Sequence, residues 1–190
     1  MAEIHRFDAF WAEITPCEHF VQIYESDNPF LDALTGFIGG GLLADEAAVV
    51  IATANHRTDL IERLAESGIN VETAQSNDQL ILLDADETVA KFMVNGWPDD
   101  QRFKQAIADI LERARGPHRR KIRAFGEMVA ILWANGHSGA TVRLEHLWHD
   151  MCHQEVFCLF CAYPKIGTTE SPLQSFVEVL RAHSKVLPAA

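Results

Sequence analysis

The stretch that most constrains the fold is Lys121–Pro164, which is patterned as strand, helix, helix and strand. Ile122–Phe125 is a short mixed run, and Val156–Cys161 is almost continuously apolar until Pro164 stops it. Between these two runs, Gly126 and Gly136 bound one helix, and apolar residues spaced three to four apart mark a second. Strands that are apolar on both faces and separated by helices are typical of a covered parallel sheet.

The rest of the chain repeats this alternation. Further strands are expected at His19–Tyr24, Ala47–Thr53 and Leu80–Leu83, with helices between them, a short extended piece at Asn70–Ala74 and a rigid corner at Trp97-Pro98. The pattern predicts an α/β fold: a doubly wound, mostly parallel sheet of about five strands with helices on both faces.

The first strand is followed by the segment Tyr24–Phe30, where a phosphate-binding loop would lie in a nucleotide-binding protein. This segment has no lysine and no glycine, and it carries the carboxylates Glu25 and Asp27. The glycines at 39–41 follow a helix, so they are expected to cap its C-terminus and not to cradle a phosphate. The sequence therefore argues against polyphosphate binding.

Several segments carry a family resemblance: HFVQIYES, KFMVNGWPDDQRF, FGEMVAILWANG, RLEHLWHDM, FCLFCAYP and AHSKVLP. Together they resemble the methanogen/methylotroph sensory domain, MEDS, over residues 17–188. That family is similar in fold to the RecA and circadian-clock ATPases, here with a degenerate phosphate loop, and usually stands in front of signalling modules. The resemblance implies a sensory module whose partner is a histidine kinase or transcription regulator, acting in trans because no output domain is attached.

Residues 1–16 are expected to form a separate helical arm, whose apolar stripe (Phe7, Phe10, Trp11, Ile14) packs on the domain or on a partner. The 190 residues otherwise suit one domain. The formal charge of −11 argues against direct binding to nucleic acid or an anionic membrane. No signal peptide or run of about 18 apolar residues is present, so a cytoplasmic location with reduced cysteines is expected.

A ligand is expected at the carboxyl ends of the strands, as in other open parallel sheets. The candidate ligand-binding residues are Tyr24, Glu25, Thr53, Asp84, Arg123, Glu127, Cys161, Tyr163 and His183. Arg123 is expected to pair with Glu127 or Asp84, and His183 to fold back over the pocket or to cap a helix. The side chains of Tyr24, Glu127 and Tyr163 are expected to converge. This mixture of aromatic rings, a thiol and carboxylates suits a small, partly apolar ligand.

No catalytic template is present, so we expect neither enzyme activity nor a cofactor. One alternative is residual nucleotide binding or weak ATPase activity that uses Asp84 and Glu127. Another is a metal- or haem-dependent redox sensor that uses His149, His153 and Cys152, although a polar helix face explains the spacing of His146, His149 and His153 more simply. Cys158 and Cys161 have C-x-x-C spacing but should point to opposite faces of their strand. A homodimer is left open.

Overall fold

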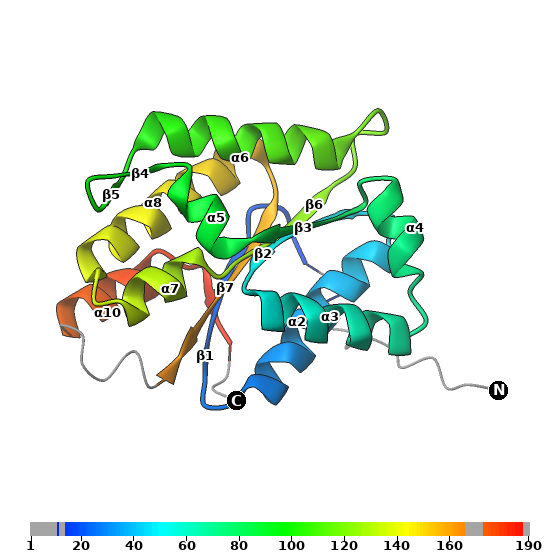
Figure 1. Ribbon diagram of the computed structural model, residues 1–190, viewed down its shortest axis with the longest axis horizontal. Helices are drawn as coiled ribbons and strands as arrows, with labels where there is room; N and C mark the ends of the chain where they lie inside the picture. Colours follow the sequence, from blue (N-terminus) through cyan, green and yellow to red (C-terminus); the bar gives the residue numbers. More distant parts are fainter. Residues whose placement is uncertain (1–10, 12–13, 166–172, 188–190) are drawn as a thin grey trace.

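The computed structural model describes Trp11, residues 14–165 and residues 173–187 (Figure 1). Its centre is a six-stranded sheet in the order β3-β2-β6-β7-β1-β8, in which every neighbouring pair is parallel. The strands are β1 (His19–Tyr24), β2 (Ala47–Ala52), β3 (Leu80–Asp84), β6 (Ile122–Gly126), β7 (Cys158–Pro164) and β8 (Lys185–Val186). The predicted doubly wound, parallel α/β fold is confirmed, with one further strand in this sheet, β8, that the sequence did not predict.

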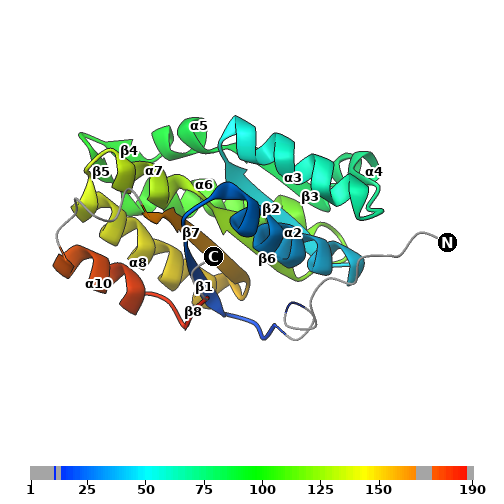
Figure 2. The same ribbon diagram turned by 90° about the horizontal axis from the view of Figure 1, so that it is seen from below.

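Helices cover both faces of the sheet (Figures 1 and 2). On one face lie α2 (Asp27–Leu43), α3 (Ala54–Glu66) and α4 (Val71–Ser76). On the other lie α5 (Ala85–Ala90), α6 (Asp100–Arg115), α7 (Met128–Ala134), α8 (Ser138–Glu155) and α10 (Leu173–Arg181). Successive strand residues point to opposite faces, so each strand contributes to both of the resulting hydrophobic cores.

Three local elements differ from the sequence prediction. Asn70 accepts a hydrogen bond from the Thr73 amide at 2.9 Å, and this N-cap starts α4 where an extended piece was expected. The corner at Trp97-Pro98 is strand β5, which pairs antiparallel with β4 (Met93–Val94). Strand β7 begins two residues later than expected, because Val156 has a left-handed conformation (φ 54°) that ends α8.

The glycines at 39–41 lie inside α2, which continues to Leu43, so their prediction as a C-terminal cap was wrong. Gly41 instead allows close packing, as does Gly36 earlier in the same helix. A Cβ on Gly41 would lie 2.7 Å from the Cδ atom of Arg123, and one on Gly36 would lie 2.6 Å from the Trp11 ring. The missing side chains therefore make room for a buried arginine and a buried tryptophan.

The described part of the expected N-terminal arm is Trp11 and residues 14–16, and the remainder of residues 1–13 lies outside the described residues. Residues 14–16 are not helical, so the predicted helix does not extend to residue 16. The Trp11 ring is buried against Phe20, Phe37 and Phe160, so this residue of the stripe packs on the domain. None of the helices in the described ranges combines the length and apolar content of a membrane-spanning helix.

Candidate functional site

The expected ligand-binding residues do not form one pocket. In the parallel register of β1 and β7, Tyr163 lies beside Ile23, so it shares the face of Ile23 and not that of Tyr24. Tyr24 belongs to the core under α2, and Tyr163 to the core under α7 and α8. The predicted convergence of Tyr24, Glu127 and Tyr163 was therefore wrong, because the two tyrosines lie on opposite faces of the sheet.

Glu127 and Thr53 meet at the carboxyl ends of β6 and β2. The helix after β2 covers one face and the helix after β6 covers the other, which makes this a topological switch point, where open α/β sheets bind ligands. Glu127 Oε2 accepts a hydrogen bond from the Thr53 amide, and Oε1 lies against His56 Nδ1, each at 2.8 Å. The hydrogen bond to Glu127 raises the pKa of His56 above its ordinary value.

These residues line an open cavity of about 560 Å³, which we call the switch-point crevice; its lining is Asp27, Thr53, Asn55, His56, Thr58, Asp59 and Glu127. Tyr24 lies nearby, stacked on Phe30 with ring centroids 4.7 Å apart. Burial, and then the proximity of Glu127, raises the pKa of the Tyr24 hydroxyl. Both carboxylate oxygens of Glu127 already have hydrogen-bond partners in the protein, so Glu127 needs no ligand to complete its hydrogen bonds.

Three other expected residues, Asp84, Glu25 and Arg123, have structural partners elsewhere. Asp84 caps α5 by accepting from the Glu87 amide at 3.0 Å, and it pairs with Arg57 at 2.9 Å. Glu25 is exposed and pairs with Lys165.

Arg123 lies toward the amino end of the sheet, beside Ala48 in the register of β2 and β6. Its guanidinium is buried and pairs with Glu46 at 2.6 Å, while donating to the carbonyls of Trp11 and Phe37. The expected pairing of Arg123 with Glu127 or Asp84 was therefore wrong, because two residues of strand separate Arg123 from the carboxyl end.

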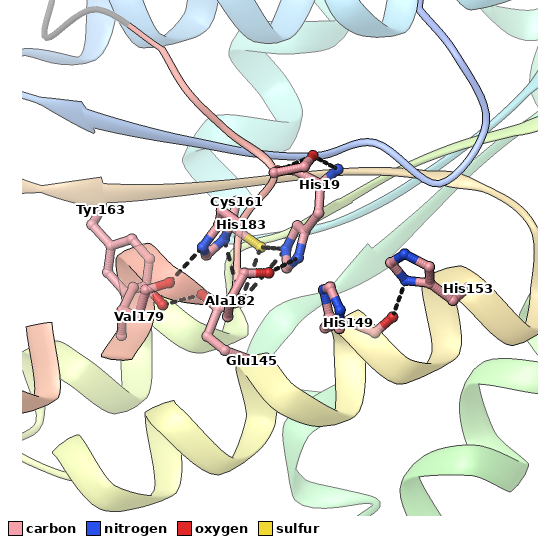
Figure 3. Close-up of polar contacts among 10 residues, drawn as sticks. His19, Glu145, His149, His153, Cys161, Tyr163, Val179, Ala182 and His183 are labelled. Carbon is pink, nitrogen blue, oxygen red and sulfur yellow. Dashed lines mark hydrogen bonds and ion pairs between the residues drawn. The ribbon is translucent and has the colours of Figure 1, made fainter. Parts of the chain in front are cut away.

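The remaining expected residues, Cys161, Tyr163 and His183, come together on the other face of the sheet (Figure 3). There they meet two residues that the sequence prediction missed, His19 of β1 and Glu145 of α8. We call His19, Glu145, Cys161 and His183 the His–Glu–Cys cluster. The side chains of both histidines and of Glu145 are fully buried, as is Cys161.

The ligand-type atoms of this cluster point at one another. Glu145 Oε2 lies 3.4 Å from His183 Nε2, 3.6 Å from His19 Nε2 and 3.7 Å from Cys161 Sγ. His19 Nε2 and Cys161 Sγ are 3.4 Å apart. The other carboxylate oxygen, Oε1, accepts a hydrogen bond from the Tyr163 hydroxyl.

The two histidine rings are oriented by backbone carbonyls. His19 Nδ1 lies 3.1 Å from the Ala182 carbonyl, and His183 Nδ1 lies 2.6 Å from the Val179 carbonyl (Figure 3). A carbonyl only accepts hydrogen bonds, so each Nδ1 carries the proton and each Nε2 presents a lone pair. The buried Nε2 of His183 has no hydrogen-bond partner. The rings are therefore held with two lone pairs aimed into the cluster.

Burial dominates the electrostatics of the cluster. It raises the pKa of Glu145 and raises the pKa values of Cys161 and Tyr163 well above their ordinary range. It lowers the pKa of His19, with the neighbouring His183 as the next cause. Burial thus drives Glu145, Cys161 and His19 toward their neutral forms, and a cation bound among them would favour the ionised carboxylate and thiolate.

The residues of the expected redox site are arranged differently. His149 and His153 lie one turn apart on α8 with ring centroids 4.4 Å apart, and His153 donates to the His149 carbonyl. Cys152 Sγ donates to the Phe157 carbonyl, and burial raises its pKa to about 12. None of the three belongs to a group of potential metal ligands within the described part of the chain.

The prediction that Cys158 and Cys161 point to opposite faces is confirmed. Cys158 lies in the core under α2, where its Sγ donates to the Thr15 carbonyl, and Cys161 joins the cluster on the other side.

Of the two cluster residues that the sequence prediction missed, His19 and Glu145, only Glu145 is marked by a pattern in the sequence. Glu145 interrupts the apolar face of α8, one residue after the buried Leu144 and three before the buried Trp148.

The model of the methanogen/methylotroph, DcmR sensory domain matches residues 18–184, a range that includes all four residues of the His–Glu–Cys cluster. A comparison with curated proteins found no significant match. The family match covers most of the chain and agrees with the resemblance seen in its sequence motifs. This chain therefore belongs to the MEDS family of sensory domains.

Proposed function

We propose that this chain is a cytoplasmic, non-catalytic sensory module whose ligand binds at the His–Glu–Cys cluster. The observation that carries the proposal is a set of four buried, ionisable side chains that converge from distant parts of the chain, with a lone pair left unpartnered. Buried ionisable clusters cost stability and are therefore candidates for function. The family is one of sensory domains, which favours ligand detection over catalysis.

The signal leaves through the C-terminal segment, defined here as residues 173–187 (α10 and β8). This segment supplies His183 to the cluster and lies along β1. The amides of Ser184 and Leu187 donate to the carbonyls of His19 and Val21, each at 2.8 Å. Helix α10 packs on α8, which carries Glu145. A ligand in the cluster would therefore hold the segment against β1, α8 and β7 at once.

The switch-point crevice supports a nucleotide less well. Asp27 and Asp59 line it, so it would repel a polyphosphate. Asp84, which the ATPase alternative would use, is occupied as the cap of α5 and as the partner of Arg57. These contacts argue against the alternative of residual ATPase activity.

The partner in this proposal is a histidine kinase or a transcription regulator that binds in trans. Strand β8 forms one edge of the sheet in the described part of the chain, so a partner that contacts this edge responds directly to the position of the C-terminal segment. The formal charge of −11 supports a protein partner over direct contact with DNA.

The test is amide hydrogen exchange of the segment in a Glu145→Ala variant. Removing the carboxylate takes away the group between His19 and His183, so the segment should open more often. Loss of an interaction of about 1.4 kcal/mol corresponds to roughly tenfold faster exchange at Ser184 and Leu187. The amide of Ala48, which donates to Gln79 across the sheet, reports any global loss of stability.

Thr141→Ala is the matched control, because Thr141 is fully buried one turn earlier on α8 and bonds only to backbone carbonyls outside the cluster. Its effect at Ser184 and Leu187 should be small. Equal exchange at these two amides in wild type and Glu145→Ala would refute the coupling of cluster and segment.

A further inference from the structure

We propose that the His–Glu–Cys cluster binds one divalent transition-metal ion, best matched by Zn²⁺, through His19 Nε2, Glu145 Oε2, Cys161 Sγ and His183 Nε2. The inference rests on the proposed function in that it names the chemical class of the ligand that the module detects. It can be tested independently, because metal binding does not require a signalling partner.

Four of the six separations among these atoms match a tetrahedral coordination shell. Zinc bond lengths place ligand atoms about 3.4 Å apart for nitrogen and oxygen, about 3.5 Å for nitrogen and sulfur, and about 3.6 Å for oxygen and sulfur. The observed separations are 3.4 and 3.6 Å from Glu145 Oε2 to the two histidines, 3.4 Å from His19 to Cys161, and 3.7 Å from Cys161 to Glu145. All four atoms lie within 4.8 Å of one another.

A metal-free hydrogen-bond network explains these distances less well. A protonated Glu145 would donate to one imidazole nitrogen, and such bonds are normally about 2.7–2.9 Å long. The carboxylate oxygen instead stays 3.4 Å or more from both nitrogens, and His183 Nε2 makes no hydrogen bond. The carboxylate oxygen and the two imidazole nitrogens are therefore too far apart for strong direct bonds and correctly spaced to share a cation. The two contacts of Cys161 Sγ, with His19 Nε2 and Glu145 Oε2, have lengths that suit either a sulfur hydrogen bond or a shared cation.

The surroundings of the cluster resemble the outer shell of a metal site. Each histidine donates its Nδ1 proton to a backbone carbonyl, which fixes the tautomer that leaves Nε2 free to coordinate. The Tyr163 hydroxyl donates to Glu145 Oε1, which directs Oε2 toward the centre. Ligating histidines and carboxylates in metalloproteins are held by contacts of this kind.

Charge balance favours a divalent ion. A thiolate from Cys161 and a carboxylate from Glu145 carry two negative charges, and the two imidazoles are neutral ligands. A divalent cation makes the buried centre neutral, which avoids the cost of burying a net charge. The protons of the thiol and the carboxyl group leave to solvent when the ion binds.

The donor set selects the class of metal. A thiolate with two imidazoles suits zinc and related first-row ions, whereas Mg²⁺ and Ca²⁺ require oxygen ligands. Four protein ligands in a buried position leave no open site for a substrate, as in structural zinc centres. The ion would join β1, α8, β7 and the C-terminal segment. A signalling partner would therefore detect bound ion through the position of that segment.

The first experiment titrates the full-length, metal-stripped protein with Co²⁺ and then with Zn²⁺. One equivalent of Co²⁺ should give visible bands of tetrahedral cobalt and a near-ultraviolet thiolate-to-cobalt band, and Zn²⁺ should displace it. X-ray absorption of the zinc form should fit one sulfur at about 2.3 Å and three nitrogen or oxygen atoms at about 2.0–2.1 Å. Absence of stoichiometric binding, or a shell without sulfur, would overturn the proposal without the need for any variant.

Two pairs of variants locate the site. Cys161→Ser should abolish the thiolate band, and Cys158→Ser, on the opposite face of the same strand, should keep it. Tyr163→Phe should weaken zinc binding by about 10–100-fold through its outer-shell bond, while Tyr24→Phe leaves affinity unchanged. The double variant His149→Ala, His153→Ala should bind normally. Binding that survives Cys161→Ser, or that is lost only in the double histidine variant, would place the metal elsewhere.

Failure of this inference and failure of the proposed function give different results. If zinc binds at the cluster but exchange at Ser184 and Leu187 is the same with and without it, the metal site stands and the signal path is wrong. If Glu145→Ala frees the segment but wild type takes up no metal, the signal path stands and the ligand class is wrong.

Discussion

The pairing of Glu127 with His56 predicts a pH-dependent loss of stability in a Glu127→Gln variant. Glu127 Oε1 and His56 Nδ1 are 2.8 Å apart, and only 8% and 12% of the two side chains are exposed. The hydrogen bond to Glu127 raises the pKa of His56, so the folded state favours the protonated ring. The resulting stability is fully present below the unfolded pKa of about 6.5 and is lost as pH rises through the higher folded value.

The size of the loss in unfolding free energy depends on which hydrogen bonds the substituted glutamine can still make. When His56 is neutral, the amide oxygen of the glutamine can accept from the Thr53 amide while the amide nitrogen of the glutamine donates to His56 Nδ1, so both contacts survive. With a protonated His56, two donors face each other. A hydrogen bond to a charged group contributes about 1.5–3 kcal/mol, and partial exposure places this pair at the lower end. We expect a loss of about 2 kcal/mol near pH 5.5 and less than about 1 kcal/mol near pH 8.5.

The assay is urea denaturation of wild type, Glu127→Gln, His56→Gln and the double variant at both pH values. In the His56→Gln background, the cost of Glu127→Gln should no longer depend on pH, because the titrating partner is gone. Equal losses at the two pH values in the wild-type background, or a larger loss at the higher one, would refute the reasoning.

Two further predictions concern α2 and nucleotide binding. Gly41→Ala should lower the unfolding free energy by about 1–3 kcal/mol in urea denaturation, because its Cβ would lie 2.7 Å from Arg123 Cδ. Gly40→Ala is the control, with its nearest atom, Arg123 Nη1, at 3.4 Å; equal stability of the two variants would contradict the packing argument. ATP with Mg²⁺ at millimolar concentration should not raise the melting temperature. A nucleotide at 100 times its dissociation constant would add about 2.7 kcal/mol, so a clear rise would show that the crevice binds polyphosphate after all.

The fold could be predicted because its signals are local and repeated. Each of the five expected strands is a short apolar or mixed run bounded by turn or cap residues, and strand patterns that alternate with helices indicate a parallel sheet. Strand β8 escaped prediction because it has only two residues, Lys185 and Val186, both exposed, and its pairing with β1 leaves no periodic pattern in the sequence. The glycines at 39–41 were misassigned because the approach of Arg123 and Trp11 to this part of α2 depends on the tertiary structure and leaves no pattern in the local sequence.

The candidate site was only partly predictable, and the reason is geometric. The rule that ligands bind at the carboxyl ends of strands selects an edge of the sheet but not one of its two faces. Tyr24 and Tyr163 satisfy the rule equally, yet the register that places Ile23 beside Tyr163 sends the tyrosines to opposite faces. Cys161, Tyr163 and His183 were selected from the sequence, and Glu145 and His19 were not.

His19 shows why the missing residues could not be found from a motif. It is the first residue of β1, 126 positions before Glu145 and 164 before His183, distances that match no metal-binding spacing pattern. Its part in the cluster depends on the parallel pairing of β1 with β7, which places its side chain on the face of Cys161, and on the pairing of β1 with β8, which brings the C-terminal segment alongside. The i, i+4 pair His149 and His153 has a conventional spacing but lies beside the cluster, with His153 at the surface. In a parallel sheet built from long crossovers, ligand spacing within one element is therefore a weaker guide than strand order. A buried acidic residue on an apolar helix face, such as Glu145, is the better sign that distant partners converge on it.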